Sequence, residues 1–164
     1  MRLAALAGVR QHFRMVRPLL PAWFGQGKQL ESLGNSASLT SDRSTELLFK
    51  EILTRGGFAG PQNFERLAVA KIAHHAPRAI LVDFDHLETD RLECVRQIRF
   101  VLPQCTIAVV SSDLQGAWAA QCHLAGATGV LSRSDVAHML AGLRQAVRSG
   151  CYTDRSFTAQ VPDA

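Results

Sequence analysis

The most constraining feature of the chain is a short apolar run over residues 79–82 that ends abruptly in the carboxylate of Asp83. An apolar run of this length with polar residues beyond it is typical of a strand that is buried on both faces of a sheet. More acidic residues follow at Asp85, Glu88 and Asp90. Ligands of open α/β sheets bind at the carboxyl ends of the strands, so this run also indicates where the chemistry would lie.

Strand-like and helix-like patterns alternate along residues 37–150. The predicted strands are 37–40, 58–63, 79–83, 106–111 and 128–131, and the predicted helices are 44–55, 64–75, 90–102, 114–125 and 134–149. This alternation implies parallel strands joined by right-handed crossovers, with helices on both faces of the sheet. Five strands of this size predict a doubly wound, flavodoxin-like α/β fold with the strand order 2-1-3-4-5.

The charge of the chain is unevenly distributed. The net charge is +4, yet residues 1–30 contain five basic residues and no acidic one, so the rest is close to neutral. We therefore expect an N-terminal extension over 1–36, a domain over 37–150 and a C-terminal tail over 151–164. Residues 1–17 are either a loose extension or a basic amphipathic helix that lies on an acidic membrane surface or a partner.

Several classes of protein are disfavoured by what the sequence lacks. No apolar run approaches the roughly 20 residues of a membrane-spanning helix. No glycine-rich phosphate loop, nucleophile elbow or metal-hydrolase spacing is present, so the chain is not expected to be an enzyme. The six histidines fit no catalytic or metal pattern and are expected at the surface or on helix faces.

The cysteines indicate a reducing compartment. Cys94, Cys105, Cys122 and Cys151 are widely spaced and form no Cys-x-x-Cys pair. Paired ligands at short spacing are typical of zinc sites, so none is predicted. We expect reduced and mostly buried thiols in a cytoplasmic protein.

Four segments together resemble the receiver domain of bacterial response regulators, of the kind found in NarL/LuxR-class regulators. They are Ala79-Ile-Leu-Val-Asp83 with Asp90-Arg-Leu-Glu93, Arg96-Gln-Ile-Arg-Phe-Val-Leu-Pro103, Val109-Val-Ser111-Ser112, and Leu124-Ala-Gly-Ala-Thr-Gly-Val-Leu-Ser-Arg133. The first is similar to the strand that carries the phosphoacceptor. The last is similar to the Ala-Gly-Ala-x-Gly-Tyr-Leu-x-Lys signature before the final helix. The resemblance covers roughly residues 42–154.

This resemblance implies phosphoryl transfer to Asp83, with Ser111 as the switch hydroxyl and Arg133 as the cation that pairs with the phosphate. It also implies Mg²⁺ held by Asp42 and Asp83, since Mg²⁺ in proteins is bound by a few carboxylates and waters. Catalysis in such a site is mostly positioning and charge neutralisation. The implied partners are a histidine kinase or phosphotransfer protein and a downstream protein, and a second copy of the chain is a further candidate.

The sequence departs from the family pattern at several of these positions. The departures are Ser41 beside Asp42 in place of two acids, Arg133 for lysine, Ser111 for threonine, Val130 for an aromatic residue, and Leu87 and Arg91 for proline and glycine. Arginine keeps the charge but has a planar fork in place of a compact ammonium. A receiver that signals without phosphate is therefore the alternative hypothesis. A third is a truncated transcription regulator, although residues 151–164 cannot hold a DNA-binding domain and no direct DNA binding is expected.

Overall fold

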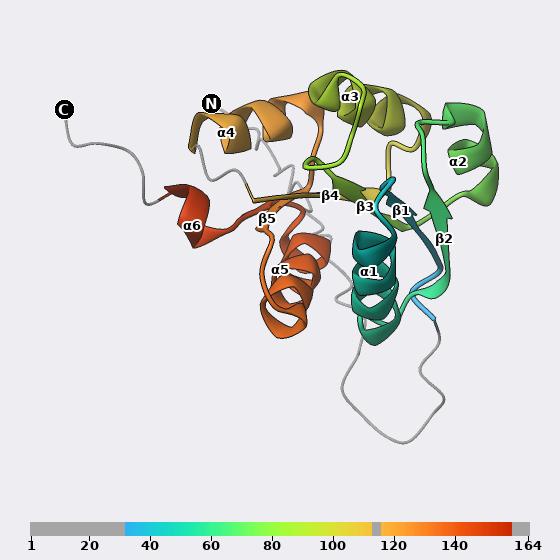
Figure 1. The fold of residues 1–164 in the computed structure, drawn as a ribbon, viewed down its shortest axis with the longest axis horizontal. Helices are drawn as coiled ribbons and strands as arrows, with labels where there is room; N and C mark the ends of the chain where they lie inside the picture. Colours follow the sequence, from blue (N-terminus) through green and yellow to red (C-terminus); the bar gives the residue numbers. More distant parts are fainter. Residues whose placement is uncertain (1–31, 113–115, 159–164) are drawn as a thin grey trace, which may run out of the picture.

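A six-stranded parallel sheet forms the centre of the protein in the computed structural model, which describes residues 32–112 and 116–158. The sheet order is β2-β1-β3-β4-β5-β6 (Figure 1). The strands are β1 (Asn35–Leu39), β2 (Ala59–Phe64), β3 (Ala79–Asp83), β4 (Thr106–Ser111), β5 (Gly129–Ser132) and β6 (Tyr152–Thr153). The predicted order of the first five strands is confirmed, and β6 is an addition that the sequence did not predict.

Six helices surround this sheet in the described residues. They are α1 (Arg43–Arg55), α2 (Val69–His75), α3 (Arg91–Val101), α4 (Gly116–Ala125), α5 (Val136–Ser149) and α6 (Arg155–Thr158). Figure 1 shows α1 and α5 on one face of the sheet and α2, α3 and α4 on the other. The doubly wound α/β architecture is therefore as expected.

The sheet separates two apolar cores, because neighbouring side chains of a strand point to opposite faces. Every residue of β3 is buried, as expected for a central parallel strand. Ile80 and Val82 belong to the core under α2, α3 and α4, whereas Ala79 and Leu81 belong to the core under α1 and α5. This strand thus holds Asp83 firmly at its carboxyl end.

Two helix starts differ from the sequence prediction. The helix expected over 64–75 begins at Val69, because Phe64 pairs with Leu39 as the last residue of β2. The last helix was expected to be capped by Ser134. Asp135 is the N-cap instead, and its carboxylate accepts a hydrogen bond of 2.8 Å from the backbone N–H of His138.

The fold continues beyond residue 150, where the sequence predicted only a tail. Gly150 adopts a left-handed conformation with φ of 71°, which ends α5 and turns the chain back toward the sheet. Tyr152 and Thr153 then pair in parallel with Gly129 and Val130. A two-residue strand has no detectable periodicity, so no pattern in the sequence indicated it.

Three of the four cysteines are buried, as expected, and all four are free thiols. Burial raises the pKa of Cys94 and of Cys105 to about 12 and that of Cys122 to about 11. These thiols therefore stay protonated at neutral pH and are poor nucleophiles. Across residues 32–112 and 116–158, no helix is both long and apolar enough to cross a membrane.

Candidate functional site

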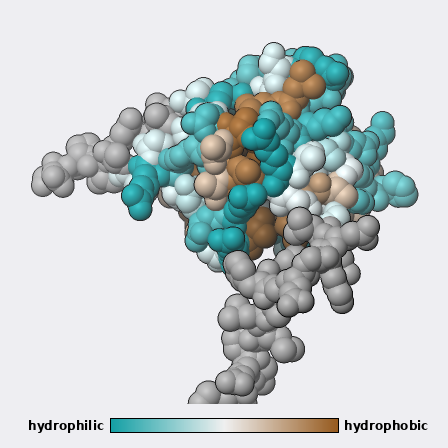
Figure 2. Space-filling model, turned by 90° about the horizontal axis from the view of Figure 1, so that it is seen from below, coloured by the Kyte–Doolittle hydropathy of each residue, from teal (hydrophilic) through white to brown (hydrophobic). Residues whose placement is uncertain are grey.

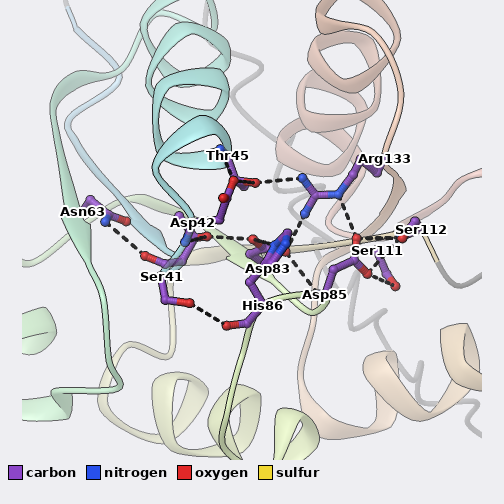
Figure 3. A network of polar contacts seen from close by, with 11 residues as sticks. Ser41, Asp42, Thr45, Asn63, Asp83, Asp85, His86, Ser111, Ser112 and Arg133 are labelled. Atoms are coloured by element: carbon purple, nitrogen blue, oxygen red, sulfur yellow. Dashed lines mark hydrogen bonds and ion pairs between the residues drawn. The ribbon is translucent and has the colours of Figure 1, made fainter.

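A cluster of charged and hydroxyl side chains lies at the carboxyl edge of the sheet (Figure 3). Asp83 ends β3, Ser111 ends β4 and Arg133 directly follows β5. Neighbouring parallel strands end at the same edge, so these three residues come together although they are far apart in sequence. The sequence predicted all three positions.

Asp83 is fully buried, and both of its carboxylate oxygens accept hydrogen bonds. Oδ2 accepts from the Thr40 hydroxyl at 2.7 Å and from Nδ1 of His86 at 2.8 Å. Oδ1 accepts from Nη2 of Arg133 and from the backbone N–H of Asp85 at 3.1 Å. A buried charge is costly without partners, and here the guanidinium of Arg133 and three further hydrogen-bond donors stabilise it.

Arg133 connects three elements through its guanidinium group. Nη2 pairs with Asp83, Nε donates to Asp85 at 2.7 Å, and Nη1 donates to the Thr45 hydroxyl in α1 at 2.9 Å. The rigid fork of arginine allows these donors to point in different directions, which a single ammonium group could not reproduce. The side chain is 23% exposed, so the guanidinium is partly buried.

Ser111, predicted as the switch hydroxyl, contacts the carboxylate of Asp85. Its Oγ donates to Oδ1 of Asp85 at 2.9 Å. Ser112 also binds Asp85, through its backbone N–H at 3.0 Å and its hydroxyl at 2.8 Å. Burial acts to raise the pKa of Asp85, but the hydrogen bonds from Ser112, Arg133 and Ser111 outweigh it, and the pKa lies below its usual value.

Asp42, predicted as a metal ligand, is the N-cap of α1. Its Oδ2 accepts from the backbone N–H of Thr45 at 2.7 Å and from the Thr45 hydroxyl at 2.8 Å. These two hydrogen bonds lower the pKa of Asp42. Asp42 is linked to Asp83 only indirectly, since its backbone N–H donates to the Thr40 hydroxyl at 3.1 Å, and that hydroxyl donates to Asp83.

The arrangement does not fit Mg²⁺ as it stands. Both oxygens of Asp83 are engaged, and the guanidinium of Arg133 lies between Asp83 and Asp85. No group of three or more histidine, cysteine, aspartate or glutamate residues suited to a metal ion occurs in the described ranges. The positive charge that the carboxylates require is supplied by a side chain of the protein.

Sequence reasoning missed Asp85 and His86 as members of this cluster. Asp85 belongs to the acidic run after β3, and its position two residues beyond Asp83 was the available signal. His86 was expected at the surface or on a helix face, and it is exposed at the surface. Its ring is partly exposed, but Nδ1 contacts the fully buried carboxylate of Asp83. That contact depends on the loop after β3, whose conformation the sequence pattern does not reveal.

Replacement of Asp42 by asparagine should make the free energy of unfolding depend less on pH in the acid range. A carboxyl with a lowered pKa contributes stability above its unfolded pKa of 3.8, and this contribution is lost as the pH falls through the folded pKa. Asparagine caps a helix about as well as aspartate but does not titrate. The free energy of unfolding, measured with urea at a series of pH values from 5 downward, should fall less steeply for Asp42→Asn than for wild type. Parallel profiles would contradict this.

Comparison with known proteins identifies the fold. No protein-family model matches the sequence, and no curated protein matches it. Among solved structures, a LuxR-family two-component response regulator from Aurantimonas sp. SI85-9A1 superposes with a TM-score of 0.69 at 16% identity, covering 80% of this chain and 96% of that chain.

Two further solved structures are similar. The isolated REC domain of RcsB from Salmonella enterica serovar Typhimurium, determined with phosphomimetic BeF3⁻, gives a TM-score of 0.67 at 10% identity, covering 79% of this chain and 98% of that chain. A response regulator from Burkholderia pseudomallei with a phosphorylated aspartic acid, a calcium ion and citrate gives 0.60 at 19% identity, covering 70% and 69%. The chain therefore has the fold of the response-regulator receiver domains.

Proposed function

We propose that this protein is a signalling module of the receiver fold that acts through protein contacts and does not need a phosphoryl group. The observation that carries this proposal is the ion-pair bridge of Arg133 to Asp83 and Asp85. In a phosphate-dependent site, charge must be neutralised when the phosphoryl group arrives. Here a permanent cation of the chain already pairs with both carboxylates and offsets one of their two negative charges.

The surroundings of Asp83 support the same conclusion. A carboxylate that acts as a nucleophile needs a free oxygen directed at the donor. Asp83 has no exposed surface, and Thr40, His86, Arg133 and the backbone of Asp85 hold its oxygens. An acyl phosphate at Asp83 would carry about 1.5–2 negative charges in place of the single charge of the carboxylate. No metal-binding cluster of the described residues offsets the added charge.

A phosphate-accepting receiver is the second candidate. Asp83, Ser111 and Arg133 meet at one edge of the sheet, which is the set that the sequence resemblance implies. Phosphorylation of Asp83 by a histidine kinase or phosphotransfer protein, with Mg²⁺ at Asp42 and Asp83, would require Arg133 and His86 to leave Asp83. The first candidate needs no such rearrangement.

Partner contacts would lie on the outer faces of the helices. Large apolar side chains that are exposed in the described part of the chain are Leu47, Phe100, Leu124 and Val147. Figure 2 shows the face that carries α1 and α5, where apolar side chains gather among hydrophilic ones. Exposed apolar patches often mark protein interaction sites.

Intact-mass measurement after incubation with a small phosphodonor and Mg²⁺ separates the two candidates. We expect no phosphoryl adduct on the wild-type protein, while a known receiver domain treated in parallel gains one. The Asp83→Asn variant serves as the matched control, and circular dichroism verifies that both samples are folded. A single adduct on wild type that is absent from Asp83→Asn would overturn the first candidate in favour of the second.

A further inference from the structure

The C-terminal residues of the domain place an aromatic side chain in a pocket beside the charged cluster. Phe157 comes from the four-residue helix α6, yet it is only 2% exposed. It packs in the apolar core with Phe84, Val109, Cys122 and Val130, and it lines a small cavity together with these residues, Arg91, Ser111 and Trp118. This cavity has a volume of about 10 Å³, roughly the space that one water needs, so little room remains beside Phe157.

A small number of directed contacts attaches this segment to the rest of the fold. The backbone N–H groups of Tyr152 and Asp154 donate to the carbonyls of Thr128 and Val130, each at 2.9 Å. These bonds add β6 to the edge of β5. A strand edge offers unpaired N–H and C=O groups, so the edge of β5 can accept any extended segment of suitable sequence.

Polar side chains fix the direction in which the segment leaves the strand. Asp154 pairs with Nε2 of His138 at 2.6 Å through one oxygen. Its other oxygen accepts from the backbone N–H of Ser156 at 3.0 Å and from the Ser156 hydroxyl at 2.8 Å. The Thr153 hydroxyl lies 2.7 Å from Nε2 of His123 in α4. Asp154 thus anchors the turn that carries Phe157 into the pocket.

We propose that the edge of β5, His138 and the pocket beside Trp118 form a peptide-binding site, and that residues 152–158 occupy it as an intramolecular ligand. The site takes an extended segment that pairs with β5, then an aspartate that binds His138, then an aromatic residue for the pocket. Because Ser111 lines the pocket and also binds Asp85, an occupant of this site touches a residue of the charged cluster. The inference does not depend on whether Asp83 accepts phosphate.

A labelled peptide tests this site in trans. The peptide contains residues 150–158 with serine in place of Cys151, and its binding to the full chain is followed by fluorescence anisotropy. The Phe157→Ala and Asp154→Ala variants weaken the intramolecular ligand, so they should bind the peptide about tenfold or more tightly than wild type does. Phe100→Ala is the matched control, because Phe100 is 88% exposed on α3, and it should behave as wild type.

The side-chain requirement is tested by a second peptide in which the phenylalanine is replaced by alanine, which should bind none of the proteins. If Phe157→Ala is not folded by circular dichroism, Asp154→Ala decides the comparison. Equal affinity of wild type and the folded variant, or no binding to the folded variant, would overturn the proposal.

Competition with the wild-type protein gives an independent measurement. Excess unlabelled peptide should displace residues 152–158 and accelerate tryptic cleavage after Arg155, whereas the alanine peptide should not. An unchanged cleavage rate at peptide concentrations that saturate Phe157→Ala would also overturn the proposal.

Discussion

Arg133→Ala should lower the free energy of unfolding by about 3–5 kcal/mol, which is the usual cost of removing one partner from a buried ion pair. The variant leaves the fully buried carboxylate of Asp83 without its guanidinium partner and leaves Asp85 with only neutral donors. Urea unfolding monitored by circular dichroism measures the loss. A loss below about 1 kcal/mol, typical of surface ion pairs, would show that the bridge contributes little.

Divalent metal should distinguish this variant from wild type. With the guanidinium gone, Asp83 and Asp85 become two neighbouring carboxylates, the kind of ligand that Mg²⁺ prefers. Millimolar MgCl2 should therefore raise the melting temperature of Arg133→Ala more than that of wild type, because a ligand that binds only the folded state stabilises it. NaCl at equal ionic strength is the control. Equal shifts in both proteins would contradict the view that Arg133 takes the place of a metal ion.

The Arg133→Lys variant tests whether the positive charge at this position is sufficient or whether the shape of the guanidinium group is also needed. Lysine keeps one positive charge but lacks the planar fork that reaches Asp83, Asp85 and Thr45 together. We expect an intermediate loss of stability and a smaller response to MgCl2 than in Arg133→Ala. If Arg133→Lys is as stable as wild type, the charge alone accounts for the effect.

The fold was largely predictable because the strands after residue 78 are continuous apolar runs bounded by glycine, proline or polar residues. The position of Asp83 followed from the same pattern, since ligands of such sheets bind at the carboxyl ends of the strands, whereas Ser111 and Arg133 were implied by the resemblance to receiver domains. The hydrogen-bond partners of these residues could not be predicted from the sequence. Whether Ser111 binds Asp83 or Asp85 depends on the backbone path of the loop after β3, and no periodic pattern encodes that path.

The role of Asp42 could not be predicted from the sequence either. An aspartate after a strand and before a helix fits both a metal ligand and an N-cap. The structure directs the Asp42 carboxylate to Thr45, so the local hydrogen bond of the helix start is satisfied first. The short strand β6 was missed for a different reason, because it is stabilised by tertiary contacts of Asp154 and Phe157 rather than by a local pattern.

Arg99→Met should be the second strongly destabilising change, with an expected loss of about 3 kcal/mol. The guanidinium of Arg99 in α3 donates to the backbone carbonyls of Gly126, Pro103 and Cys105 at distances of 2.7–2.9 Å. It also donates to the Thr128 hydroxyl at 3.0 Å, and that hydroxyl accepts from the backbone N–H of Ile107 at 3.1 Å. The arginine thus joins the end of α3 to the starts of β4 and β5.

Methionine retains an apolar stem of similar length but removes every one of these donors, so the carbonyls lose partners that charged hydrogen bonds had supplied. Arg96→Met is the matched control one turn earlier on α3, because Arg96 pairs only with the half-exposed Glu93 and should cost less than about 1 kcal/mol. Urea unfolding of both variants gives the comparison. Equal losses would mean that Arg99 contributes no more than an ordinary surface arginine, and that the loops before β4 and β5 are held by the apolar core alone.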